Sequence, residues 1–257
     1  MKIVFIGAGN LATHLSSALQ NGGHDIIQVY SRTHASAATL AAKLGTEAVD
    51  SINNVRTDAD AYIIAVKDDA LPEVARRVGA RCRHGVLLHT AGSVAKDVLG
   101  VAATRYGVIY PMQSFSKSRS LCLHDVPIYV EANCDEALAI AKTLAGSVST
   151  KVRELPGEAR RHLHLAAVFA SNFVNCCYDL ASDEAAAAGV PFSDFLPLID
   201  ETAAKVHELS PHDAQTGPAV RNDQTVMDRQ LQLLDGAPMA HVVYCVLSEA
   251  IHRRHSH

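Results

Sequence analysis

A glycine-rich segment near the start of the chain has the composition and placement of a loop that binds a diphosphate. The residues Gly7-Ala8-Gly9-Asn10-Leu11-Ala12 follow an apolar run at 3–6 and open a helix-like run at 11–19. The first glycine permits a tight turn, the second lets the backbone approach a pyrophosphate, and the helix start holds the anion. We therefore expect a dinucleotide, contacted by Gly7, Gly9, Asn10 and Leu11. A glycine-rich turn without a ligand is the alternative.

The segment after the second predicted strand carries a guanidinium between two hydroxyls. Domains that prefer NAD place an Asp or Glu there, about 20 residues beyond the glycines, to accept the ribose hydroxyls. This chain has Ser31, Arg32 and Thr33 instead. Because arginine binds a phosphate through two hydrogen bonds, and hydroxyls add donors, we predict NADP(H) as the cofactor. A solvated loop arginine is the alternative.

Further candidates follow the next predicted strands, at the edge of a parallel sheet where ligands bind. Val66 and Thr90 end or follow the strands at 61–66 and 86–89, and we expect them at the cofactor. Gln113 and Ser114 follow the strand at 108–110, and we expect them at a substrate. Each side chain could instead bond only to backbone or water.

Three polar residues share one face of a long apolar helix predicted in the second half. His164, Ser171 and Asn175 are separated by seven and four residues, so at 100° per residue they fall within about 40° of one another. A polar stripe in an apolar helix needs partners, which are either other helices or a substrate. We predict His164 as a general acid, with Ser171 and Asn175 orienting a carbonyl or imine. A purely structural stripe is the alternative.

Thr216 and Arg221, further along the chain, are predicted to contact an anionic substrate. Arg221 could hold a carboxylate or phosphate. Pro218 is typical of the first turn of a helix, which would place Thr216 and Gly217 at its positive N-terminus.

The elements that must position these residues fall into two domains. Short apolar strands at 3–6, 26–30, 61–66, 86–89, 108–110 and 128–130 alternate with helical stretches such as 11–19 and 35–44. This alternation predicts an α/β domain over 1–153, a Rossmann-type and mostly parallel sheet with helices on both faces. Residues 154–257 are predicted to be all-helical, with runs at 162–188, 192–209, 222–234 and 239–252. Their apolar character predicts a homodimer through this domain.

Composition limits the partners and the compartment. A hydrophobic content of 48% with a net charge of −4 describes a globular chain that has no basic field for nucleic acid or a membrane surface. Its six cysteines form no C-x-x-C pair, so we expect reduced thiols and a cytoplasmic protein. The 14 histidines include no H-E-x-x-H motif, and no metal site is predicted.

Several of these segments together resemble a known bacterial family of two-domain proteins. The segments are GAGNLA at 7–12, SRT at 31–33, HTAGS at 89–93, YPMQSFS at 110–116, HLHLAAVFASNFVN at 162–175 and AQTGPAVRND at 214–223. Members of that family join an NADP-oxidoreductase-like Rossmann domain to a helical domain of uncharacterised function. The resemblance covers nearly the whole chain and extends to pyrroline-5-carboxylate reductases and to 6-phosphogluconate and β-hydroxyacid dehydrogenases.

The chain departs from those wider relatives at their substrate motifs. Thr216-Gly217-Pro218 stands where pyrroline-5-carboxylate reductases carry a Gly-Gly-Thr-Thr type segment, and no lysine lies between 152 and 204 to match the hydroxyacid dehydrogenases. The resemblance therefore implies NADP-dependent hydride transfer to or from a small C=O or C=N substrate held between the domains, without naming that substrate. A non-catalytic NADP(H)-binding or regulatory protein is the competing hypothesis.

Overall fold

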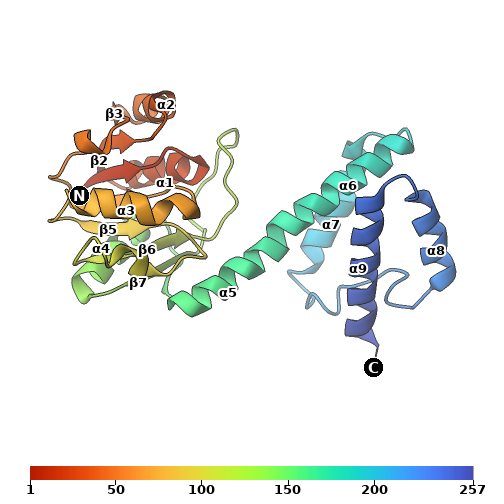
Figure 1. Ribbon diagram of the computed structural model, residues 1–257. Coiled ribbons are helices and arrows are strands. Elements are labelled where there is room, and N and C mark those ends of the chain that lie inside the picture. The colour runs from red at the N-terminus through yellow and green to blue at the C-terminus, as the bar shows by residue number, and fades with distance from the viewer. Residues whose placement is uncertain (257) are drawn as a thin grey trace. The chain divides into compact units, whose positions relative to one another are not determined.

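The computed structural model describes residues 1–256, which form two compact units (Figure 1). The first unit is Met1–Asn172, and the second begins at Phe173. The first unit contains every strand of the described chain, and the last strand ends at Glu154. All regular elements beyond that residue are helical.

The first unit is built on one eight-stranded sheet in the order β3-β2-β1-β4-β5-β6-β7-β8. Only the β6–β7 pair is antiparallel; the other neighbours run parallel. The strands are β1 Lys2–Ile6, β2 Asp25–Tyr30, β3 Glu47–Val49, β4 Ala61–Ile64, β5 Val86–His89, β6 Tyr106–Pro111, β7 Ile128–Ala132 and β8 Val152–Glu154.

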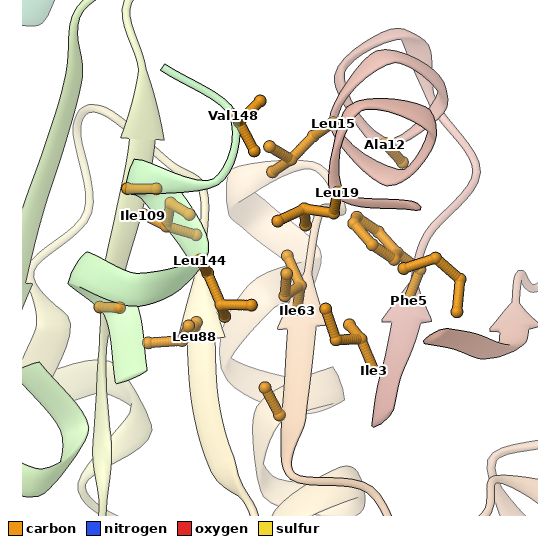
Figure 2. Close-up of a cluster of buried hydrophobic side chains, with 14 of the residues drawn as sticks. Ile3, Phe5, Ala12, Leu15, Leu19, Ile63, Leu88, Ile109, Leu144 and Val148 are labelled. Atoms are coloured by element: carbon orange, nitrogen blue, oxygen red, sulfur yellow. The ribbon is translucent and has the colours of Figure 1, made fainter. Parts of the chain in front are cut away.

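Helices cover both faces of the sheet, because successive strand residues point to opposite faces and both sets are apolar. One face packs on α1 (Asn10–Asn21), α2 (His34–Leu44) and α4 (Asp135–Gly146), and the other packs on α3 (Leu71–Gly79). Figure 2 shows the first core, in which strand residues Ile3, Phe5, Ile63, Leu88 and Ile109 meet Leu15, Leu19 and Leu144 from the helices. Short 3₁₀ turns lie at Ile52–Asn54, Asp68–Ala70 and Lys96–Leu99.

The observed sheet confirms the predicted fold class. The six predicted strands all form. Helix α1 begins one residue before and ends two residues after the predicted run 11–19, and α2 begins one residue before the predicted run 35–44 and ends with it. Strands β3 and β8, each of three residues, were not predicted, because Glu47-Ala48-Val49 and Val152-Arg153-Glu154 are too short and too polar for an apolar run. Helices α3 and α4 were not predicted either.

One unbroken helical stretch runs from Gly157 to Ala187. It consists of α5 (Gly157–Ala167), a π-helical segment (Val168–Phe173) and α6 (Val174–Ala187). The π segment carries more residues per turn than an α-helix, so residues on either side of it are not related by 100° steps. The single-face relationship predicted for His164 and Asn175 therefore does not follow from their spacing.

The second unit contains α6, a 3₁₀ turn at Phe192–Phe195, α7 (Leu196–Lys205), α8 (Gln224–Leu233) and α9 (Pro238–His255). Helix α9 contacts α8 where the Tyr244 hydroxyl donates to Gln230 Oε1 at 2.6 Å. Few of its apolar side chains are buried, and exposed ones occur on its helices and in the turns between them. These are Phe173, Val174, Val190, Leu196, Leu198, Val206, Leu209, Leu233, Met239, Val242, Val246 and Leu247.

Candidate functional site

The loops that follow β1, β4, β5 and β6 meet at one edge of the sheet. These four strands are neighbours in the sheet and run parallel, so their carboxyl ends lie side by side. Ligands of open parallel sheets bind at this edge. The loops carry the glycine-rich segment after β1, Val66 after β4, Thr90 after β5 and Gln113 after β6.

The glycine-rich loop has the local geometry that a pyrophosphate requires. Gly7 has a φ of +118°, and a Cβ there would lie 2.3 Å from the carbonyl oxygen of Ala65, so only glycine fits this close approach to β4. Gly9 is exposed, and a Cβ added to it would meet no atom within 4 Å. Gly9 is also the N-cap of α1 and provides no side-chain cap, so the first-turn N–H groups of α1 are left for an anion. The loop therefore fits a dinucleotide diphosphate.

The segment after β2 offers donors for a phosphate. Arg32 is exposed, and no ion pair holds its guanidinium within residues 1–256. Ser31 Oγ accepts from the Thr33 backbone N–H at 3.4 Å, which folds the segment into the start of α2. An unpaired arginine beside two hydroxyls fits the 2′-phosphate that distinguishes NADP from NAD.

Side chains of α1 tie the glycine-rich loop to the loop after β6. Asn10 Nδ2 donates to the carbonyl oxygen of Phe115 at 2.9 Å, and His14 Nε2 lies 2.9 Å from the carbonyl oxygen of Ser116. The rings of His14 and Phe115 also pack with centroids 5.6 Å apart. Asn10 is predicted to contact the cofactor, and in the structure its side chain binds the loop that carries Gln113 and Ser114.

A tyrosine and a histidine form a hydrogen-bonded pair at the end of β6. Tyr110 Oη lies 3.0 Å from His164 Nδ1, and the rings meet edge to face. Tyr110 is 7% exposed, and burial raises the pKa of its hydroxyl. Because Tyr110 occupies Nδ1, the other ring nitrogen, Nε2, is the one that can bond a substrate.

His164 packs closely against the loop after β5. A Cβ on Gly92 would lie 2.5 Å from His164 Nδ1, so the absence of a side chain at Gly92 is what admits the imidazole. The same loop contains Thr90, which is 7% exposed and whose N–H donates to the Ile64 carbonyl oxygen at 3.2 Å. The predicted proton donor thus touches the strand edge near the predicted cofactor loops.

A buried arginine on α5 binds the backbone of the loop after β5. Arg160 on α5 is 1% exposed, and its Nη1 donates to the carbonyl oxygens of Ala91 and Gly92 at 2.7 and 3.0 Å. Its Nη2 lies 3.4 Å from Glu131 Oε2, and Glu131 Oε1 accepts from Lys96 at 3.0 Å. Burial lowers the pKa of Arg160, and Glu131 opposes that effect. Nη1 and Nη2 thus fix the loop beneath His164, while the buried Nε has no hydrogen-bond partner in the described chain.

His89, the last residue of β5, supports the same loop from inside the core. It is fully buried, and its Nδ1 accepts from the Ala91 N–H at 3.1 Å. Burial, followed by the nearby Arg160 charge, lowers the pKa of His89 to about 4. The imidazole is therefore neutral near pH 7, and it serves as a hydrogen-bond acceptor for the backbone.

A pocket of about 610 Å³ opens beside the Tyr110–His164 pair. It lies within the first unit, between the loop after β6 and the stretch from α5 into the π segment. Its lining includes the predicted residues Gln113, Ser114, His164 and Ser171. Tyr110, Met112, Phe115, Leu163, Ala166, Ala167, Val168, Ala170 and Asn172 complete it.

Three of the predicted residues, Asn175, Thr216 and Arg221, belong to the second unit. All three are exposed, and their roles at the site stay predictions. The helix start expected at Pro218 is wrong, because residues 218–222 form turns and α8 begins at Gln224, capped by the Asp223 carboxylate. Thr216 and Gly217 therefore do not lie at a helix N-terminus.

Tyr110 and Arg160 were not among the predicted site residues. Tyr110 was visible as a hydroxyl at the carboxyl end of a strand, which is a usable signal. Arg160 precedes Arg161, and nothing in their types separates the buried one from the exposed one. No group of three or more His, Cys, Asp or Glu side chains that could hold a metal occurs in the described chain.

Three features together define a nicotinamide-dinucleotide-binding protein. They are the strand order of the sheet, the glycine-rich loop after β1 and the arginine after β2 that forms no ion pair in the described chain. Two family models match the sequence: residues 2–91 match "NADP oxidoreductase coenzyme F420-dependent", and residues 126–251 match "Domain of unknown function (DUF2520)". No curated protein matches the chain.

Solved structures give the family. The "putative NADP oxidoreductase BF3122 from Bacteroides fragilis" is 43% identical over 98% of both chains, with a TM-score of 0.95. The chain belongs to the family of this NADP oxidoreductase, which confirms the oxidoreductase class and the NADP(H) cofactor that the sequence predicts.

More distant structures share the fold. An imine reductase from Myxococcus stipitatus in complex with NADP⁺ is 19% identical over 99% of this chain and 96% of its own, with a TM-score of 0.66. A 1-pyrroline-5-carboxylate reductase from Streptococcus pyogenes is 15% identical over 98% of both chains, also with a TM-score of 0.66.

Proposed function

We propose that the protein transfers a hydride between NADP(H) and a small compound with a C=O or C=N bond, bound in the pocket beside Tyr110 and His164. The observation that carries this proposal is the 3.0 Å hydrogen bond between these two side chains at the carboxyl end of β6. The imidazole of His164 lines the 610 Å³ pocket. A hydrogen bond from Asn10 on α1 to the carbonyl oxygen of Phe115 holds the loop after β6, which forms part of the same pocket. Bound NADPH would supply the hydride.

His164 is the proton donor in this proposal. An imidazolium can give its Nε2 proton to the substrate oxygen or nitrogen while hydride reaches the carbon. The Tyr110 hydroxyl suits both states of the ring, because the ring keeps its Nδ1 proton when Nε2 gives up its own, so Tyr110 accepts from Nδ1–H before and after the transfer. Tyr110 thereby fixes the orientation of the ring, and Ser171 and Gln113 are placed to hold the substrate's polar group.

The cofactor in this proposal is bound by the loops at the carboxyl ends of the strands. The N–H groups at Asn10 and Leu11 hold the pyrophosphate, and Gly7 and Gly9 leave room for it. Arg32, with Ser31 and Thr33, holds the 2′-phosphate, so NADPH is preferred over NADH. Val66 and Thr90 border the nicotinamide end at β4 and β5.

A non-catalytic NADP(H)-binding or regulatory protein is the second candidate function. The exposed apolar helices of the second unit favour association, which a regulatory protein would also need. Spectrophotometric screening of ketones, keto acids and cyclic imines with NADPH separates the two. An oxidoreductase consumes NADPH with some member, whereas a regulatory protein binds NADPH and leaves it unchanged.

We also propose a homodimer formed through the second unit. Its exposed apolar residues include Leu233 at 77%, Met239 at 72% and Val246 at 61% exposure. Exposed apolar surface of this kind marks interfaces. A cytoplasmic location is consistent with six free cysteines, as reducing compartments keep thiols unpaired. No helix of the described residues is long and apolar enough to cross a membrane.

A further inference from the structure

The pocket beside Tyr110 and His164 has a mostly apolar lining with few polar groups. In the described chain, no Asp, Glu, Lys or Arg side chain lines it. Its polar groups are amides and hydroxyls, such as Gln113 and Ser171, and its only titratable side chains are Tyr110 and His164. The rest of the wall is aliphatic or aromatic, including Met112, Phe115 and Leu163.

Cations close to the pocket in sequence or space are directed elsewhere. The Arg160 guanidinium is committed to the carbonyl oxygens of Ala91 and Gly92 and to Glu131, and it is 1% exposed. Lys117 and Arg119 follow Phe115 in the same loop, yet they line a different cavity beside α1. A substrate carboxylate in this pocket would therefore meet no fixed cation from the first unit.

We propose that the substrate is uncharged around its reacting bond: a ketone or imine with apolar substituents rather than a keto acid or an imino acid. A carboxylate loses hydration on entering a pocket and needs a cation or several donors in return. An apolar substituent instead gains from contact with Met112, Phe115 and the alanines of the stretch 163–172. This inference rests on the proposed function and replaces the anionic substrate expected from Arg221.

A matched pair of ketones tests the proposal. Phenylacetone and phenylpyruvate differ by a methyl group in place of a carboxylate on the same carbonyl carbon. NADPH oxidation is measured with the two ketones under identical conditions. We expect kcat/KM for phenylacetone to exceed that for phenylpyruvate at least tenfold. A preference for phenylpyruvate would overturn the proposal.

A variant that adds the missing cation provides the converse test. Gln113→Arg places a guanidinium in the pocket, where it can bind a carboxylate through two hydrogen bonds. It should shift the ratio of kcat/KM at least tenfold towards phenylpyruvate, whereas Gln113→Asn should leave the ratio unchanged. An Arg221→Ala variant checks the second unit. If wild type prefers phenylpyruvate and Arg221→Ala loses that preference, Arg221 supplies the cation and the proposal is wrong.

A binding measurement separates this inference from the hydride-transfer proposal. Calorimetry on the NADP⁺-loaded protein compares 1-phenyl-2-propanol with 3-phenyllactate, the corresponding alcohols. If neither ketone is reduced but the uncharged alcohol binds at least tenfold more tightly, hydride transfer fails and the preference for an uncharged ligand stands. Tighter binding of phenyllactate, or binding of neither alcohol, would overturn the inference.

Discussion

Tyr110 Oη and His164 Nδ1 are 3.0 Å apart, and this bond joins strand β6 to helix α5 inside one compact unit. His164 belongs to a helical stretch that was predicted to lie in a separate domain from the sheet. Its ring nevertheless packs against Gly92, in the loop after β5. A side chain on α5 is thereby held at the place where ligands of parallel sheets bind. The pair can be tested separately from the cofactor loops.

Replacing each member of the pair should affect turnover differently. His164→Ala removes the proton donor and should lower kcat by about 10² to 10⁴, because general acids contribute that much. Tyr110→Phe keeps the ring and removes only the hydroxyl, so it should lower kcat by a smaller factor. Steady-state kinetics with the best substrate from the NADPH screen gives both values, and the affinity for NADPH should stay within about twofold. If both variants melt at a lower temperature and lose activity by the same factor, the pair has a structural role instead.

Cofactor choice should depend on Arg32. Wild-type protein should bind NADPH at least tenfold more tightly than NADH, because a charge-assisted hydrogen bond contributes about 1.5 to 3 kcal/mol. Arg32→Ala should abolish the difference by weakening NADPH alone. Titration of nicotinamide fluorescence measures both affinities, and Arg77→Ala on α3 serves as a control at an exposed arginine. Equal wild-type affinities would refute the assignment of the 2′-phosphate to Arg32.

His89 should make the protein less stable in acid. Its pKa is about 4 in the folded protein against 6.5 for an unperturbed histidine, so between these values the unfolded chain binds the extra proton. Stability from this residue is present above pH 6.5 and is lost as the pH falls towards 4. The loss between pH 7.5 and pH 5 should be about 2 kcal/mol, from 1.36 kcal/mol per pKa unit.

Urea denaturation at the two pH values measures that loss. His89→Asn keeps an acceptor for the Ala91 N–H and removes the titration, so the variant should lose about 2 kcal/mol less than wild type over the same interval. An identical pH dependence in the two proteins would show that His89 is not responsible.

The proposed dimer should depend on α9. Sedimentation of wild type should give twice the chain mass of 27.4 kDa. Val242→Glu with Val246→Glu places two charges on side chains that are 53% and 61% exposed, and should yield monomers, because charge is excluded from apolar interfaces. Val101→Glu, at a 79% exposed position in the first unit, should leave the dimer intact. A wild-type monomer at micromolar concentration would remove the proposal.

The pattern of apolar runs in the sequence was sufficient to predict six strands of the sheet, but not the two strands at its edges, β3 and β8. Strands β1 and β4 are recognisable from their continuous apolar runs, which they have because helices cover both of their faces. Edge strand β3 and strand β8 form because neighbouring backbone pairs with them, a tertiary effect that three-residue segments do not encode. The π segment at Val168–Phe173 was equally invisible, and it removes the basis for placing Asn175 with His164.

The site was predictable where a residue type carries its own chemistry. Gly7 and Arg32 fit a known loop geometry, and His164 is a titratable group in an apolar stretch. Arg160 could not be found, because its importance comes from burial against the carbonyl oxygens of Ala91 and Gly92, which only the tertiary structure creates.

Gly92 provides the sharpest test of the geometry around His164. A Cβ in Gly92→Ala would lie 2.5 Å from His164 Nδ1 and 2.9 Å from its Cβ, so the imidazole or the loop must shift and the position of the ring changes. Because hydride and proton transfer need close alignment, kcat should fall at least tenfold. NADPH affinity should change little, since Gly7 and Arg32 are untouched. Gly146→Ala, where an added Cβ meets open space, is the matched control. Full activity in Gly92→Ala would mean that the position of His164 does not limit the reaction.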